Sequence, residues 1–233
     1  MITASGRIPQ LSLVLGPTAG GGAYGPALTD VVVLAPNGRI FVTGPDVVKS
    51  VTGEKIDIAT LGGPDAHRKN SGVAHVIAHS EEEAFAEIRD LTSLFADQGR
   101  LNTDLVDEDL AMYVPAATKR AYEVHPLVNA ILDRDGEKLE LLPMWAENMT
   151  TVIGRFGGRT VGVLANNPQH LGGVLDSSAA EKAARFVRTC DAFGIPLIVI
   201  ADVPGFLPGA GQEWEGAVRR GAKLLHAFGE AVV

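Results

Sequence analysis

The stretch Gly16-Pro17-Thr18-Ala19-Gly20-Gly21-Gly22-Ala23-Tyr24-Gly25-Pro26 directly follows the apolar run Leu11-Ser12-Leu13-Val14-Leu15. Glycine loses more backbone entropy on folding than other residues, so this density of glycine is costly in an ordinary turn. It is favoured where backbone must come close to a ligand, or where peptide N–H groups point outward together. The apolar run predicts a strand, and the glycines predict a loop that opens a short helical segment.

Three interpretations of the glycine loop remain open from the residues themselves. Gly20, Gly22 and Gly25 fit the dinucleotide pattern G-x-G-x-x-G, but Pro26 interrupts the helix that should follow. Alternatively, the glycines simply admit tight packing between a strand and a helix. The third interpretation is an oxyanion hole, in which adjacent N–H groups at a helix start stabilise negative charge on a thioester carbonyl oxygen. Such chemistry needs no nucleophile, and the chain contains no G-x-S-x-G elbow.

The composition narrows the classes of protein. The chain has 233 residues, 46% of them hydrophobic, and a formal net charge of −8, which fits a globular protein and argues against non-specific nucleic-acid binding. Cys190 is the single cysteine, so we predict no disulfide framework. It lies in a predicted helix, and we expect its side chain to fill the protein core. The histidines lack metal-ligand spacing, so no metal site is predicted. Without an apolar signal region or a membrane-length run, we expect a cytoplasmic protein with no membrane association.

The order of predicted elements is that of an α/β protein. Helices are expected to start at residues 80 and 178, each with a capping box, Ser80 with Glu83 and Ser178 with Glu181. A rigid Pro/Gly loop at 202–209 follows a strand predicted to be buried. The acidic, irregular segment 98–112 predicts a boundary between two lobes. The remaining expectations are strands at 10–15, 31–35, 39–42, 73–78, 149–155, 159–165 and 195–201, and helices at 43–53, 126–132 and 214–230.

Several long motifs resemble one family. The stretch from Ala19 to Asp30 is similar to the N-domain loop of carboxyltransferase β subunits of acyl-CoA carboxylases, and Asp202-Val203-Pro204-Gly205-Phe206-Leu207-Pro208-Gly209 is similar to their C-domain. The resemblance covers essentially the whole chain and is strongest to the actinobacterial acetyl/propionyl-CoA branch. Further motifs that carry it are Phe41–Pro45, Leu61–Pro64, Ser71–His75, Val163–Pro168, Ser178–Asp191 and Arg220–Leu225.

The resemblance implies a ClpP/crotonase-like superhelix, present as two half-domains of a tandem crotonase-fold chain. Residues 1–113 would be the C-terminal part of the N-domain, on the acyl-CoA side. Residues 114–233 would be the N-terminal part of the C-domain, on the biotin side. The implied function is transfer of CO2 from carboxybiotin to the α-carbon of acetyl-CoA or propionyl-CoA, giving malonyl-CoA or methylmalonyl-CoA. Biotin would be carried on a biotin carboxylase/biotin carboxyl carrier α subunit, and the β subunits would form a dimer-based hexamer.

The resemblance also assigns residues to the site. Gly20 and Gly21 match the oxyanion pair for the thioester enolate, and Gly205, Phe206 and Gly209 are candidates beside the biotin pocket. Arg219 and Arg220 are candidates to bind CoA phosphates or a carboxylate, but with Lys223 on the same helix they could equally form a solvated face.

The first and last residues resemble internal stretches of the family, so we expect a fragment that is inactive by itself. Two alternatives stay open. The first is a crotonase-type acyl-CoA hydratase or isomerase, which would need paired carboxylates near the glycine loop. The second is a non-catalytic scaffold fragment.

Overall fold

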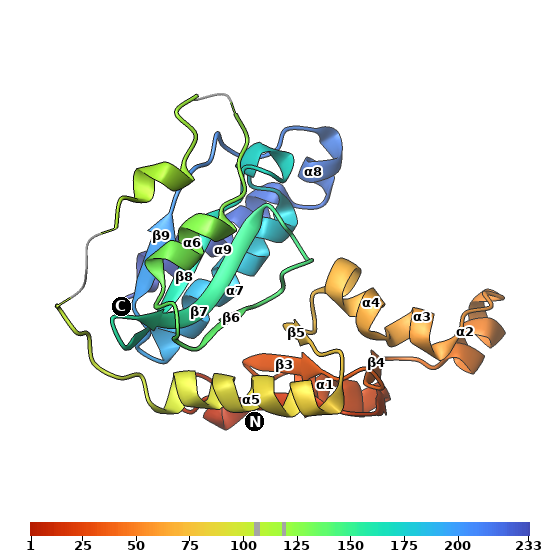
Figure 1. Cartoon of the computed structure of the whole chain (residues 1–233). Helices are drawn as coiled ribbons and strands as arrows, with labels where there is room; N and C mark the ends of the chain where they lie inside the picture. Colours follow the sequence, from red (N-terminus) through yellow and green to blue (C-terminus); the bar gives the residue numbers. More distant parts are fainter. Residues whose placement is uncertain (105–107, 118–119) are drawn as a thin grey trace. The chain divides into compact units, whose positions relative to one another are not determined.

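The computed structural model of the protein describes residues 1–104, 108–117 and 120–233 (Figure 1). It divides into two compact units. Unit 1 comprises Met1–Thr92 with Leu142–Trp145, and unit 2 comprises Ser93–Leu141 with Ala146–Val233. The predicted domain boundary after residue 113 stays a prediction. Residues 105–107 of the acidic segment lie outside the described residues.

Unit 1 is organised around parallel strands. Its sheet has the order β1-β3-β5, and a second parallel pair is formed by β2 and β4. The residues of β3 are all buried, as a continuous apolar run in a parallel sheet requires. The strand expected at 73–78 is shorter in the structure. The bounds are β1 (Leu11–Val14), β2 (Pro17–Ala19), β3 (Val31–Leu34), β4 (Arg39–Phe41) and β5 (Val76–Ile77).

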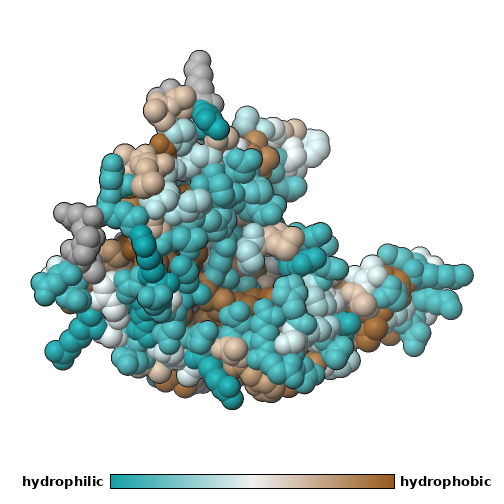
Figure 2. All heavy atoms as spheres, in the orientation of Figure 1, coloured by the Kyte–Doolittle hydropathy of each residue, from teal (hydrophilic) through white to brown (hydrophobic). Residues whose placement is uncertain are grey.

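The helices of unit 1 follow these strands. Ser80 caps α5 as predicted, because its Oγ accepts from Glu83 N–H at 3.0 Å. The Glu83 carboxylate reaches back to the N–H of His79, at 2.6 Å. Apolar atoms are exposed over the end of unit 1 that carries α2 and α3 (Figure 2), where Val51 is 79% exposed. The bounds are η1 (Ile2–Ala4), η2 (Gly20–Ala23), α1 (Tyr24–Ala27), α2 (Pro45–Thr52), α3 (Ile58–Gly62), α4 (Pro64–Ala66), η3 (His67–Ser71) and α5 (Glu81–Ala96), which enters unit 2 at Ser93.

Unit 2 is built on a mixed sheet of order β6-β7-β8-β9. The pairs β6–β7 and β7–β8 are antiparallel, and β8–β9 is parallel. The predicted strands at 149–155 and 159–165 are confirmed as a hairpin. The strand predicted to be buried at 195–201 is only partly so, because Val199 is 48% exposed. The bounds are β6 (Lys138–Glu140), β7 (Met149–Phe156), β8 (Arg159–Asn166) and β9 (Leu197–Ile200).

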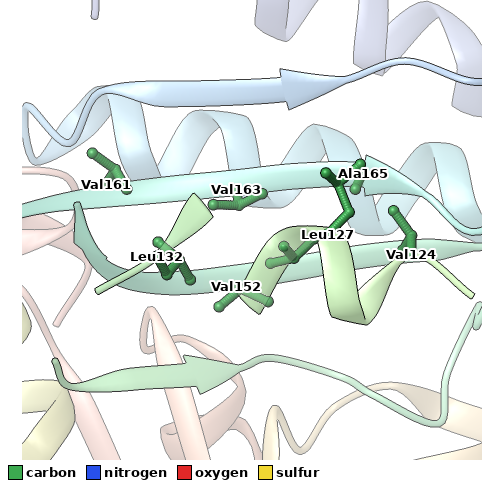
Figure 3. Packing of buried hydrophobic residues seen from close by; sticks show 8 residues of the cluster. Val124, Leu127, Leu132, Val152, Val161, Val163 and Ala165 are labelled. Carbon is green, nitrogen blue, oxygen red and sulfur yellow. The ribbon is translucent and has the colours of Figure 1, made fainter. Parts of the chain in front are cut away.

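Helices cover the two faces of this sheet. Val161, Val163 and Ala165 of β8 point toward α6, where they meet Val124 and Leu127 (Figure 3). The intervening Gly162 faces α7, and a Cβ at this glycine would lie 2.6 Å from Cys190 Sγ. This alternation is the period of a strand that is buried on both faces. The bounds are η4 (Leu110–Tyr113), α6 (His125–Ile131), η5 (Leu171–Gly173), α7 (Ser177–Ala192), α8 (Ala210–Trp214) and α9 (Ala217–Glu230).

Two helix predictions in unit 2 are wrong. The N-cap of α7 is Asp176, whose carboxylate accepts from Ala179 N–H at 2.7 Å, and Ser178 lies inside the helix. The predicted helix over 214–230 is two helices, because Gly216 adopts a left-handed φ of 87° between α8 and α9. Glycine reaches that conformation without the penalty that a Cβ imposes.

Candidate functional site

The glycine loop is held by backbone pairing between β2 and β4. Pro17 lies opposite Arg39 and Ala19 opposite Phe41 in this parallel register. The loop then turns sharply at Gly20, which has a φ of 56° and donates its N–H to Val42 O at 3.1 Å. A residue with a Cβ would be strained in this left-handed conformation. The end of β4 therefore fixes where the first turn of η2 begins.

Gly21 is the exposed residue of this turn whose amide is unpartnered among the described residues. As the second residue of a 3-10 helix, its N–H has no acceptor within the helix. No hydrogen bond joins this N–H to another of the described residues. Gly21 is exposed, and a Cβ placed on it would meet nothing within 4 Å. The predicted pair Gly20–Gly21 stays a prediction, with the Gly20 amide engaged by Val42 in this structure.

The Pro/Gly loop of unit 2 is anchored beside η5. Leu175 N–H donates to Gly205 O at 2.9 Å, and Leu207 N–H donates to Leu175 O at 2.7 Å, so Phe206 is bracketed by a parallel bridge. Gly205 and Gly209 have φ values of 140° and 141°, which residues with side chains rarely adopt. These glycines therefore set the path of the loop.

The aromatic residue of this loop lies on α9. Phe206 is 49% exposed, and its ring comes so close to Gly221 that a Cβ there would lie 2.9 Å from the ring. One edge of the ring thus packs on the helix while part of it stays accessible. A role of Gly205, Phe206 and Gly209 in biotin binding stays a prediction.

A polar cluster beside this loop was not predicted from the sequence. His125 Nε2 lies 2.9 Å from Glu140 Oε2, and its Nδ1 contacts Glu123 Oε1. The hydrogen bond to Glu140, followed by that to Glu123, raises the pKa of His125 to about 9, against the opposing effect of burial. Asn167 Nδ2 donates to Glu123 at 2.7 Å. Glu123 and His125 are two residues apart, but Glu140 and Asn167 come from distant segments, so local spacing could not have revealed the whole cluster.

A buried lysine lies near the same carboxylates. Lys182 of α7 is 2% exposed, and its Nζ lies 3.4 Å from Ala146 O. Burial lowers the pKa of Lys182 to about 8, while the charges of Glu140 and Glu147 oppose the shift. Sequence reasoning placed no function on this residue.

Two basic residues of α9 form ion pairs with one carboxylate. Lys223 Nζ lies 2.9 Å and Arg220 Nη1 3.4 Å from Glu181 oxygens of α7. The pKa of Glu181 is lowered, chiefly by its hydrogen bond with Lys223. These ion pairs join α9 to α7, and the predicted contact of Arg219 and Arg220 with CoA phosphates or a carboxylate stays a prediction.

The described residues contain neither a metal-binding cluster nor a membrane-spanning helix. No group of three or more His, Cys, Asp and Glu side chains could hold a metal ion there. Within the same ranges, no helix is both long enough and apolar enough to span a membrane.

The α/β fold is that of the crotonase-like carboxyltransferases, as comparisons with known proteins show. The family model described as "Carboxyl transferase domain" matches residues 1–233, so the chain belongs to this family. The biotin-dependent acetyl-/propionyl-coenzyme A carboxylase beta6 subunit of Mycobacterium tuberculosis is 60% identical over 236 residues, covering 100% of this chain and 50% of that protein. The propionyl-CoA carboxylase beta chain of Rhodococcus erythropolis is 59% identical, also covering 100% and 50%.

Solved structures give the same result. The transcarboxylase 12S core superposes with a TM-score of 0.95 at 40% identity, covering 100% of this chain and 47% of that one. A single-chain, multi-domain long-chain acyl-CoA carboxylase gives a TM-score of 0.87 at 32% identity, covering 99% and 24%. The chain therefore spans about half the length of the curated relatives that it matches.

Proposed function

We propose that the protein containing this chain is the carboxyltransferase component of an acyl-CoA carboxylase. It moves a carboxyl group from carboxybiotin to the α-carbon of acetyl-CoA or propionyl-CoA, the substrates named for its relatives in Mycobacterium tuberculosis. The products are malonyl-CoA and methylmalonyl-CoA. The observation that carries this proposal is the amide of the exposed Gly21, unpartnered within the described part of the chain, in the first turn that follows β2.

The proposed reaction requires no side chain of the protein to act as nucleophile or base. Carboxybiotin supplies the CO2 and, once decarboxylated, the base that removes the α-proton. The protein must stabilise the negative charge that develops on the thioester oxygen, and an oriented peptide N–H does this without a nucleophile. Gly21 N–H has no acceptor among the described residues, and it belongs to a turn whose position is fixed by the Gly20–Val42 hydrogen bond. Loss of one such donor costs about 3 kcal/mol in the transition state.

The two loops take different roles in this proposal. The glycine loop binds the acyl-CoA carbonyl, with Gly20 and Gly21 as the candidate oxyanion donors. Gly205, Phe206 and Gly209 border the biotin site, where the accessible part of the Phe206 ring offers an apolar surface to the bicyclic ring. Biotin reaches this site on a partner subunit, because biotin-dependence is named for the relatives. Assembly as a hexamer follows the transcarboxylase 12S, whose structure is described as a hexamer assembly. We place the enzyme in the cytoplasm.

The hydratase alternative fits the residues less well. A hydratase or isomerase of this fold class would need paired carboxylates beside the glycine loop. The stretch from Gly16 to Thr29 contains no Asp or Glu, and Asp30 beyond it accepts a hydrogen bond from Gln10 N–H at 2.8 Å. Proton transfer by a group that enters with the second substrate agrees better with these residues.

The test uses the full-length protein with its biotinylated partner. Gly21→Pro removes the N–H and should lower kcat by a factor of about 100 to 1,000 while the melting temperature changes little. Gly16→Ala is the matched control, because a Cβ at Gly16 meets nothing within 4 Å and the residue lies outside the turn. Full turnover by Gly21→Pro would favour the scaffold alternative. Hydration of an enoyl-CoA without biotin would favour the hydratase.

A further inference from the structure

The Pro/Gly loop of unit 2 has a single polar side chain. Between residues 202 and 209 only Asp202 carries one, and the loop also contains Pro204 and Pro208. Each proline fixes its own φ and has no N–H to donate. The loop is therefore a stiff segment whose direction depends on the few groups that hold it. Asp202, at its start, is the one residue of the loop whose side chain can form a hydrogen bond.

The backbone of Asp202 is fixed where the chain leaves β9. Its N–H donates to Asn166 Oδ1, at the end of β8, at 3.3 Å. Asn166 Nδ2 in turn donates to Gly173 O of η5 at 3.1 Å. A Cβ at Gly173 would lie 2.7 Å from Asp202 O, so the backbones of η5 and the loop are in close contact. These contacts fix the first residue of the loop and leave its carboxylate available to a further donor.

The carboxylate of Asp202 is held by a residue 80 positions earlier in the chain. Tyr122 Oη donates to Asp202 Oδ2 at 3.0 Å. The Tyr122 ring is partly buried and packs against the apolar cluster of α6, β7 and β8. Val124, two residues further on, is fully buried in the same cluster. The core of unit 2 therefore defines where the Tyr122 hydroxyl lies.

The next polar residue, Glu123, ties this segment to two strands. Glu123 Oε1 accepts from Asn167 Nδ2, just after β8, at 2.7 Å. The same oxygen contacts His125, whose Nε2 lies 2.9 Å from Glu140 Oε2 of β6. Hydrogen bonds that involve charged groups are shorter and stronger than neutral ones. The segment that carries Tyr122 is thus held at both the β6 and the β8 side.

From these contacts we infer that Tyr122 is a positioning residue for the biotin site and acts through Asp202 on the Pro/Gly loop. The inference rests on the proposed function, which places biotin against Gly205, Phe206 and Gly209. Tyr122 does not touch biotin in this role. Its hydroxyl holds the carboxylate at the start of the stiff loop, and the loop sets the position of the Phe206 ring. Without this bond the loop pivots about the backbone bridge at its middle.

Hydrogen exchange tests the inference without turnover. In the full-length protein, Tyr122→Phe removes the hydroxyl and keeps the packed ring. Exchange of Leu207 N–H, which donates to Leu175 O at 2.7 Å, should become about fivefold faster. Tyr113→Phe is the matched control, because Tyr113 packs against the same cluster and its hydroxyl donates to the Glu108 carboxylate at 2.9 Å. Equal exchange of Leu207 in the two variants would overturn the inference.

Kinetics with free biotin test whether the positioned loop serves the biotin site. The full-length protein is assayed in the direction in which malonyl-CoA carboxylates biotin. In Tyr122→Phe, KM for biotin should rise about fivefold, while kcat and KM for malonyl-CoA change by less than about twofold. General destabilisation of the fold would not produce this split. In an Asp202→Ala background, Tyr122→Phe should add nothing to KM for biotin, because its acceptor is absent.

The two readouts separate this inference from the proposed function. Faster exchange of Leu207 in Tyr122→Phe together with a raised KM for biotin supports the inference. Faster exchange with an unchanged KM for biotin would overturn it, because the loop would then move without affecting biotin. If the wild-type protein does not carboxylate biotin at all, the proposed function fails. Exchange of Leu207 would still show in that case whether Tyr122 positions the loop.

Discussion

The ring of Phe206 occupies the space that a side chain on Gly221 would need, with Phe206 Cζ 2.9 Å from the position of an added Cβ. The Pro/Gly loop and α9 are thereby in contact through one glycine. The loop is held on its other side by the backbone bridge to Leu175. Its position therefore depends on a helix that contributes no polar group to it.

Gly221→Ala should lower the free energy of unfolding by about 1 kcal/mol, because the new methyl group overpacks against the Phe206 ring. Gly229→Ala, on the same helix with nothing within 4 Å, is the matched control. It should raise stability by up to about 1 kcal/mol, since alanine is the better helix former. Urea unfolding of both variants measures the difference. Equal stabilisation by the two substitutions would show that Phe206 does not restrict Gly221.

Substitutions at Gly162 and Cys190 should change the free energy of unfolding non-additively. A Cβ on Gly162 would lie 2.6 Å from Cys190 Sγ and 3.1 Å from Phe186 Cζ, so Gly162→Ala should cost about 2 kcal/mol of stability. Removing Sγ with Cys190→Ala makes room for this methyl group. A double-mutant cycle should therefore give a total cost below the sum of the single costs by about 1 kcal/mol. Additive costs would mean that Phe186 and Leu197, and not Cys190, cause the overpacking.

The N-cap of α7 can be located by mutation. Asp176→Ala should lower the free energy of unfolding by about 1 kcal/mol, because the Asp176 carboxylate accepts from Ala179 N–H. Ser178→Ala should change it by less than about 0.5 kcal/mol, since Ser178 lies inside the helix. Chemical denaturation at pH 7 measures both. A larger loss from Ser178→Ala would restore the capping box predicted from the sequence.

His125 should make stability depend on pH. Its pKa in the folded protein, about 9, is above the ordinary histidine value of 6.5, because hydrogen bonds to Glu140 and Glu123 stabilise the charged form. This contribution is fully present below pH 6.5 and is lost as the pH rises through 9. Lys182 has the opposite effect. Its folded pKa is lowered from 10.5 to about 8, so its contribution to the free energy of unfolding rises with pH above 8.

The difference between wild type and His125→Gln isolates the histidine. The stability gap should be largest below pH 6.5 and should shrink steadily toward pH 9. Glu140→Gln removes the main partner of His125. It should therefore reduce the pH dependence of the free energy of unfolding over the same interval. A gap that stays constant from pH 6 to about 9 would contradict the link to His125 ionisation.

The sequence predicted the strands well where one residue pattern was decisive. Val31–Leu34 and the hairpin at β7–β8 were recognisable because continuous apolar runs end at clear turn residues. The α7 cap was misplaced because Asp176, Ser177 and Ser178 are all good capping residues. Which of them caps depends on where tertiary packing turns the chain. The break at Gly216 was missed because an isolated glycine is tolerated in many helices.

The site was predicted in part. Glycine density marked the loop at 16–26, since a local run of glycine is visible in any sequence. The bond from Gly20 to Val42 joins residues that only the β2–β4 pairing brings together. The same limit applies to the His125 cluster, because Glu140 of β6 meets His125 of α6 only in the folded chain. Residues that pair across such distances form no local pattern in the sequence, so the sequence alone does not predict their contact.

The partly exposed strand β9 has a practical consequence for handling the protein. Among the described residues, β9 pairs with β8 and with no strand on its other side, and Val199 is 48% exposed. Such a strand offers a row of free backbone donors and acceptors, which acts as a template for a foreign strand. A concentrated sample of the 233-residue chain is therefore prone to self-association through this edge. A lysine in place of Val199 would oppose strand addition by charge, and light scattering would record the gain in colloidal stability.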